Sequence, residues 1–443
     1  MIGGFSVLLI ILYLLIVLYI GFSASKSENE EGYLLANRDV GLFVLTATLV
    51  ASIIGGNGMV TMMAFVYEYG ISIIWAPIGT LLGFLSLAYF APKIKKLSDE
   101  HRFYTLPDFI HKKYGKAASI PAALIVFVVY IGFILIQFIA GGIVLSAITG
   151  WPYTLSVVLM GIVVMTYIFA AGYKAVIKTD IFQYFILFIL IVLAFFLFGK
   201  VGTIPSSDWN LFAAGAVNIT AFILYGLILI VTGADVWQRI YSGKDIKTVK
   251  RSLVFSGVLT MVLMVFVILI GLVIKSRFPN IVPETALAVG FIELLPSWLL
   301  GFGLVVLFAA IMSSLDTFLF LLSTSVSKDF FSKFERFSKK DFVLQTKWFS
   351  LILGILTIIL AIFFSSVVSV VTAIAGMYFS LFSVIIFSFK YQLKKGAVVL
   401  SIIGGFLASI LAFVVMGIVL EAALMSLPAS LILLGIGQLV FKK

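Results

Sequence analysis

The chain has 443 residues, of which 63% are hydrophobic and only 11% are charged, and its formal net charge is +11. It contains no cysteine, which excludes disulfides, thiolate metal sites and cysteine nucleophiles. Apolar runs near the ~20 residues that cross a bilayer recur along the whole chain. The composition therefore predicts an all-α integral membrane protein and leaves no room for a sizeable soluble domain.

Thirteen transmembrane helices are predicted, and the placement of basic residues orients them. With the N-terminus outside, the Lys and Arg residues fall on inside segments except for Lys200, Lys275 and Arg277, as the positive-inside rule requires. We expect a multi-pass protein of the cell (plasma) membrane with a cytoplasmic C-terminus, whose positive charge faces anionic lipid and not nucleic acid. The predicted spans are 4–22, 41–66, 70–92, 118–148, 152–171, 179–199, 211–238, 250–275, 297–327, 342–364, 367–389, 397–420 and 424–441.

Two of these segments contain helix-weakening residues in comparable places. Span 41–66 carries Gly55-Gly56-Asn57-Gly58, and span 211–238 carries Tyr225-Gly226. Irregular backbone at membrane depth is tolerated where it lines a cavity, and paired interruptions point to the binding site of a secondary transporter. Because the interruptions are five spans apart, they would begin two five-helix repeats of opposite orientation. The alternative for Gly226 alone is close helix packing.

The basic segment 93–116, between spans three and four, is predicted to be a solvated loop with short helices. Pro107 suits the first turn of one of them, with Thr105 or Leu106 as its cap.

The apolar segment 309–329 contains Ser313, Ser314, Asp316 and Thr317. An ionisable side chain inside a membrane segment usually marks an ion or substrate pathway. On a helix, Ser313, Asp316 and Thr317 share one face, where their oxygens suit a hard cation.

Five stretches carry a joint motif pattern: 33–58, 65–79, 104–115, 171–183 with 233–252, and 309–317 (AAIMSSLDT). In these stretches the chain resembles the sodium:solute symporter family, which includes proline, pantothenate, sialic acid and sodium/sugar transporters. The resemblance implies the five-plus-five inverted repeat of the leucine-transporter type, with one helix before and two after. The expected divisions are residues 1–40 for the first helix and linker, 41–390 for the core (repeats 41–200 and 211–390) and 391–443 for two C-terminal helices.

The resemblance also implies a sodium site between the first broken helix and span 297–327. Its ligands would be the carbonyls of Ala51, Ile54 and Ala310 and the hydroxyls of Ser313 and Ser314. An unwound segment frees carbonyl oxygens, and serine hydroxyls add neutral ones. In the alternative, both serines bond back to carbonyls of their own helix.

Some members of the family have a second cation site, which here would match Asp180, Ser313, Asp316 and Thr317. Two carboxylates there would need a cation, a proton or a basic partner. Asp180 with Gln183 also reads as a capping box at a helix start. Arg239 belongs to a family motif, but anchoring at the inner membrane surface explains it equally well.

A solute pocket is expected near the midplane, between the two interruptions. It is predicted to be small, mixed in polarity and formally uncharged, which suits a small amino acid, a monocarboxylate or a polyol/sugar. The candidate lining residues are Gly55, Asn57, Gly58, Tyr130, Gln137, Tyr225, Leu229 and Gly376.

Sodium-coupled symport of such a solute, with Na+ as the coupling ion, is the function that these features favour. A proton-coupled carrier using Asp180 or Asp316 and a transporter-like sensor or channel remain alternatives. An enzyme is disfavoured, because no His or Cys lies in the predicted spans. The expected partners are the solute, sodium and membrane lipid, and a monomer is sufficient.

Overall fold

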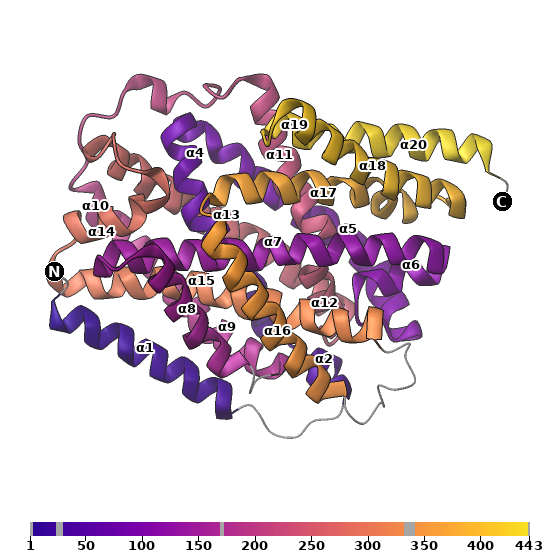
Figure 1. Cartoon of the computed structure of the whole chain (residues 1–443), viewed down its shortest axis with the longest axis horizontal. Coiled ribbons are helices and arrows are strands. Elements are labelled where there is room, and N and C mark those ends of the chain that lie inside the picture. The colour runs from indigo at the N-terminus through magenta and orange to yellow at the C-terminus, as the bar shows by residue number, and fades with distance from the viewer. Residues whose placement is uncertain (1–2, 24–29, 169–171, 332–341, 442–443) are drawn as a thin grey trace.

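The computed structural model describes residues 3–23, 30–168, 172–331 and 342–441. These residues form helices without a strand, and one isolated backbone bridge joins Val40 to Gly243. Figure 1 shows long helices running roughly side by side, with α1 along one edge and α18 and α20 along the opposite one. The predicted all-helical membrane architecture is confirmed.

Eleven helices among the described residues are long and apolar enough to cross a membrane. Two further apolar helices are shorter: α3 (Leu42–Ile53) and α8 (Tyr153–Ile168). The predicted total of thirteen stays a prediction. The long ones comprise α1 (Gly4–Ser23), the stretch Gly58–His101 with α4 (Met62–Tyr69) and α5 (Trp75–His101), α7 (Lys116–Thr149), α9 (Tyr173–Leu187) with α10 (Ile189–Phe198), α11 (Gly215–Thr232), α13 (Ile246–Arg277), α15 (Ser297–Ser325), α16 (Phe342–Phe363), α17 (Val367–Ser388), α18 (Lys395–Met416), and α19 (Leu420–Leu424) with α20 (Ser426–Val440).

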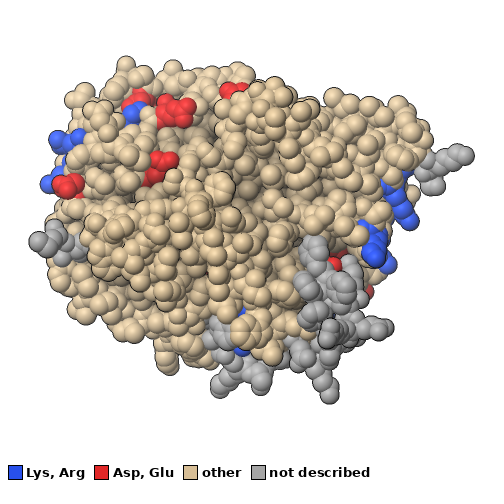
Figure 2. All heavy atoms as spheres, viewed as in Figure 1, with Lys and Arg blue, Asp and Glu red and all other residues tan. Residues whose placement is uncertain are grey.

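Most charged side chains on the visible face gather at two opposite ends, and few lie on the surface between them (Figure 2). This distribution is the one that a bilayer imposes, since charged groups avoid the hydrocarbon layer.

Helix α15 is the centre of the bundle. It contacts α1, α3, α7, α9 and α16, and every residue of its most hydrophobic 18-residue stretch is buried. By contrast, only 22% of the residues in the most hydrophobic stretch of α1 are buried, as expected for a helix at the lipid boundary. The polar side chains of α15 therefore face other helices and not lipid.

The predicted interruption at Tyr225-Gly226 is wrong, because α11 continues through both residues to Thr232. The break lies at Gly233, whose ψ of 104° ends α11 before α12 (Ala234–Ser242) begins. A β-carbon at Gly226 would come within 2.3 Å of the Ala76 carbonyl oxygen on α5. The alternative interpretation of Gly226, close helix packing, is therefore the correct one.

The segment 93–116 is more ordered than a solvated loop. Helix α5 continues to His101, and Lys95 on it is buried, where it donates to Asp99 (2.7 Å) and to the Tyr241 carbonyl (3.1 Å). Helix α6 (Leu106–Tyr114) then begins after Thr105, as predicted. The Asp108 carboxylate accepts from the backbone N–H groups of Tyr104 (2.8 Å) and Thr105 (3.0 Å).

Removing this capping carboxylate is expected to destabilise the α5–α6 connection. Asp108→Ala should cost about 1 kcal/mol of stability, because two backbone donors lose their acceptor. Thermal unfolding of the purified protein in detergent measures the effect. Asp108→Asn keeps an acceptor oxygen and should retain most of the stability, so equal midpoints for the two variants would contradict the capping role.

Candidate functional site

The first broken helix opens directly after α3. Ile54 leaves the helical conformation (φ −88°, ψ 70°), and a short π-helical turn, Asn57–Thr61, leads into α4. The Gly56 N–H donates to the Gln137 side-chain oxygen on α7 at 2.7 Å. The predicted interruption in this segment is therefore present, and an amide from another helix satisfies part of its backbone.

Glycines at the break let two neighbouring helices approach it. A β-carbon at Gly55 would lie 2.1 Å from Ser314 Oγ, and one at Gly56 would lie 2.7 Å from the β-carbon of Ala140. Both distances are shorter than real contacts allow. Helices α15 and α7 thus pack directly against the backbone of Gly55 and Gly56. This packing brings Ser313 and Ser314 of α15 (the serine pair) next to the carbonyl groups at the end of α3.

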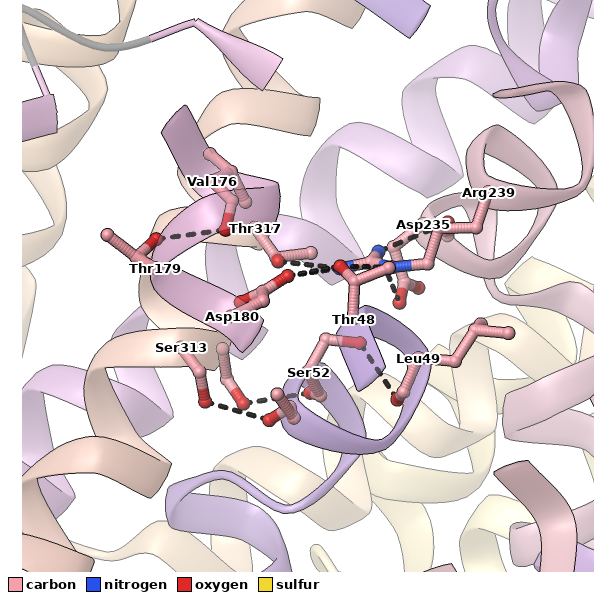
Figure 3. Close-up of polar contacts among 12 residues, drawn as sticks. Thr48, Leu49, Ser52, Val176, Thr179, Asp180, Asp235, Arg239, Ser313 and Thr317 are labelled. Carbon is pink, nitrogen blue, oxygen red and sulfur yellow. Dashed lines mark hydrogen bonds and ion pairs between the residues drawn. The ribbon is translucent and has the colours of Figure 1, made fainter. Parts of the chain in front are cut away.

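The serine pair joins α15 to the end of α3. Ser313 Oγ lies 2.7 Å from the Ala51 carbonyl oxygen and 2.9 Å from that of Ala310, and Ser314 Oγ donates to the Ser52 carbonyl at 2.8 Å. All of these residues are buried. Ser313 bonds both back within its own helix and across to Ala51 on α3, whereas Ser314 bonds only across, to Ser52. Figure 3 shows Ser313 beside the end of α3 that carries Ser52.

The structure thus brings the oxygens of Ala51, Ala310 and Ser313 together, with Ser314 one residue further along α15. Ile54 lies at the break itself, two residues beyond Ser52. The Ser52 carbonyl is an additional oxygen that the sequence did not indicate. Such an oxygen becomes visible only once α15 is packed against α3.

The second broken helix is held by two tyrosines. Tyr130 on α7 accepts from the Asp235 N–H (2.9 Å) and donates to the Asp235 carboxylate (2.5 Å). Tyr378 on α17 accepts from the Ala234 N–H at 3.3 Å. The freed backbone donors after Gly233 are therefore satisfied by phenol oxygens of neighbouring helices.

A small cavity lies between the two breaks. Among the predicted lining residues it includes Gly55, Gln137 and Leu229, and Tyr130 adjoins it through Asp235. The prediction of an uncharged pocket was wrong, because the Asp235 carboxylate lines it. Its lining residues are Ser52, Ile53, Gly55, Phe133, Gln137, Leu229, Gly233, Asp235, Ser314 and Phe318.

A larger cavity adjoins the first one, since both are lined by Ile53 and Leu229. Its other lining residues are mostly apolar and come mainly from α4, α5, α11, α13 and α17, and they include Tyr225. Ile53, the last residue of α3, and Leu229 on α11 therefore face both cavities.

The remaining predicted lining residues lie elsewhere or are not described. Gly376 faces away from both cavities, because a β-carbon on it would meet Phe413 at 2.8 Å and Ala423 at 3.2 Å. Gly58 packs near the Ile53 carbonyl (3.3 Å) and lines neither cavity. The side chain of Asn57 lies outside what the structure describes.

The candidate second cation site has a different setting from the predicted one. Asp180 is fully buried in α9, seven residues after the helix starts at Tyr173, so the capping-box interpretation is wrong. Asp180 and Thr317 both contact Arg239. Asp316 is the residue before Thr317 on α15, and its side chain is also fully buried. Arg239 is buried as well, which excludes an anchoring role at the membrane surface.

Comparison with known proteins agrees with this architecture. The profile of the sodium:solute symporter family matches residues 33–404, and the chain belongs to that family. The fold is of the leucine-transporter type.

Among relatives, the osmoregulated proline transporter OpuE of Bacillus subtilis (strain 168) is 25% identical over 79% of this chain and 76% of its own length. The sodium/proline symporter of Staphylococcus aureus (strain Newman) is 26% identical over 80% of this chain and 74% of its own. A solved Na+-coupled sialic acid symporter superimposes with a TM-score of 0.86 at 18% identity, covering 99% of this chain and 98% of that one.

Proposed function

We propose that the protein is a sodium-coupled symporter that carries a small organic solute across the membrane by alternating access. Besides family membership, one observation supports the proposal most directly. The hydroxyl of Ser313 lies within hydrogen-bond distance of carbonyl oxygens on two helices, Ala51 on α3 and Ala310 on α15. Ala51 belongs to the last turn of α3, directly before the helix ends at Ile53.

The proposed sodium ligands are the carbonyls of Ala51, Ile54 and Ala310 with the hydroxyls of Ser313 and Ser314. A hydroxyl that now donates to a carbonyl can turn its hydrogen away, so that its own oxygen and the carbonyl oxygen both face a cation. These ligands are neutral, and they replace only part of a hydration shell. Binding of that kind is reversible, which a transported ion requires.

The coupling energy is sufficient for active uptake. One positive charge that falls through 100 mV releases about 2.3 kcal/mol. A tenfold sodium gradient adds ~1.4 kcal/mol. The sum of about 3.7 kcal/mol corresponds to several-hundred-fold accumulation of the solute at equilibrium.

The proposed solute site is the cavity between the two breaks. Gln137 Nε2 is buried there and has no hydrogen-bond partner among the described residues, so it can donate to an acceptor on the solute. Phe133, Phe318 and Leu229 supply apolar walls. Because the relatives above are named as proline transporters, a small zwitterionic amino acid is the first solute to test, with a monocarboxylate and a polyol or sugar after it.

The divisions at residues 1–40, 41–390 and 391–443, the repeats 41–200 and 211–390, and the outside N-terminus are part of this proposal. The two breaks, after Ile53 and at Gly233, lie in the first helical region of each proposed repeat. The concentration of charge at the two ends in Figure 2 supports a membrane-spanning orientation along that axis.

A thermal-shift screen tests the proposal on the purified chain. Sodium alone should raise the unfolding temperature relative to potassium at equal ionic strength, and a transported solute should raise it further only when sodium is present. Sodium at about 100 times its Kd would add ~2.7 kcal/mol. A solute that stabilises equally without sodium, and whose uptake into vesicles follows a pH gradient in sodium-free buffer, would instead favour a proton-coupled carrier.

A further inference from the structure

The larger cavity, which adjoins the proposed solute site, is lined mainly by apolar side chains. None of the described residues that line it is charged, and its walls include Phe65 on α4, Phe222 on α11 and Val371 on α17. All three of these side chains are buried. Because a charged or strongly polar group would lose its hydration there without gaining partners, the cavity suits an apolar group.

The threonine hydroxyls at the larger cavity are mostly engaged within their own helices. Thr80 Oγ1 donates to the Ala76 carbonyl oxygen at 3.1 Å. Thr372 Oγ1 donates to the Val368 carbonyl oxygen at 2.9 Å. The buried hydroxyl of Thr61 has no hydrogen-bond partner among the described residues. A polyol in this cavity would therefore bury several hydroxyls and find few partners for them, which weakens binding.

The small cavity between the breaks has the opposite character. Gln137 Nε2 lines it, is buried without a hydrogen-bond partner among the described residues, and can donate. Asp235 Oδ2 has no hydrogen-bond partner there either, although Arg239 Nη1 lies 3.6 Å from it, and it can accept. An amide donor and a carboxylate acceptor in one cavity match the carboxylate and the ammonium of an α-amino acid.

The polar and the apolar cavity meet at two residues, because Ile53 and Leu229 face both of them. We propose that the larger cavity is the side-chain subsite of the solute site, and that the solute is an α-amino acid with a bulky apolar side chain, such as isoleucine, methionine or phenylalanine. Its ammonium and carboxylate lie in the small cavity, and its side chain lies in the larger one. This inference rests on the proposed function and names its substrate class.

One wall of this subsite comes from outside the proposed core 41–390. Leu420 lines the larger cavity and is the first residue of α19, which packs against α11 and α17 (Figure 1). The C-terminal region thus limits the size of the side chain that fits. Leu420 is therefore a residue that determines specificity.

Equilibrium binding of radiolabelled amino acids to the purified full-length protein, in detergent and at saturating sodium, tests the inference. Isoleucine should bind the wild type about 50-fold more tightly than alanine, because three further carbons are buried at the usual transfer free energy per carbon. Mannitol should not displace isoleucine.

Two variants alter the subsite in opposite directions. Val371→Phe fills it and should weaken isoleucine binding about tenfold or more, with alanine binding unchanged. Leu420→Ala enlarges it and should raise the affinity for phenylalanine relative to isoleucine. Val414→Phe is the matched control, because Val414 on α18 is 78% exposed, and it should bind like the wild type.

Equal wild-type affinities for isoleucine and alanine, or displacement of isoleucine by mannitol, would overturn the inference and leave sodium-coupled symport standing. A folded Val371→Phe protein with the isoleucine affinity of the wild type would overturn it too. If Val371→Phe does not fold, Leu420→Ala decides, and an unchanged preference between phenylalanine and isoleucine contradicts the inference. A wild type that sodium stabilises but that binds none of these amino acids would also overturn it, whereas a wild type that sodium does not stabilise would contradict the proposed function itself.

Discussion

Removal of both hydroxyls of the serine pair is expected to weaken sodium binding by a factor of about 30 to 150. In Ser313→Ala with Ser314→Ala, two of the five proposed ligands are lost, and at about 1–1.5 kcal/mol for each polar contact the loss is roughly 2–3 kcal/mol. Sodium titration of the thermal unfolding temperature, with potassium keeping the ionic strength constant, measures the change. Sodium-driven uptake should fall in parallel.

The control for this experiment lies on the same helix. Ser323 is equally buried in α15, but its hydroxyl bonds to the Leu319 (2.8 Å) and Phe320 (3.0 Å) carbonyls of its own helix. Ser323→Ala should leave the sodium titration unchanged. A double variant with the sodium titration of the wild type would show that the serine pair is only a structural link between α15 and α3.

A methyl group at Gly226 is expected to force α5 and α11 apart. In Gly226→Ala the new carbon would stand 2.3 Å from the Ala76 carbonyl oxygen and 2.5 Å from the Thr80 nitrogen, and both of these atoms belong to the backbone of α5. Overpacking of this kind costs about 1–3 kcal/mol, since a backbone cannot rotate away as a side chain can. The thermal unfolding midpoint and the yield of folded protein should both fall.

The effect on transport should follow from the same displacement. Helix α11 carries Leu229, which lines both cavities, and ends at the Gly233 break. Gly435→Ala is the matched control, because Gly435 is also helical and a β-carbon there would meet nothing within 4 Å. Equal stability of the two variants would mean that α5 and α11 separate at little cost.

Local sequence was sufficient for the first break and for the serine pair. Three glycines and an asparagine within four residues weaken a helix wherever they stand, so the end of α3 could be predicted from residues 55–58 alone. The family motif then placed Ser313 opposite Ala51, and the structure has these two residues in contact.

The second break could not be located in the same way. Gly226 and Gly233 are each a single glycine within the predicted span 211–238. Gly226 is required by the backbone of α5, which is distant in sequence, whereas Gly233 ends α11 because Tyr130 and Tyr378 satisfy the backbone that follows it. Only the packing of α5, α7 and α17 distinguishes them.

The sequence by itself determined that the chain is a helical membrane protein of the symporter family, because hydrophobic length, charge asymmetry and motifs are properties of consecutive residues. The tertiary structure decided which charges meet. Arg239 and Asp180 are 59 residues apart and each looked like a feature of a helix end, yet they form a buried pair 3.3 Å apart. Such a pair follows from the crossing of α9, α12 and α15, and the cost of burying either charge alone is the physical reason that the two occur together.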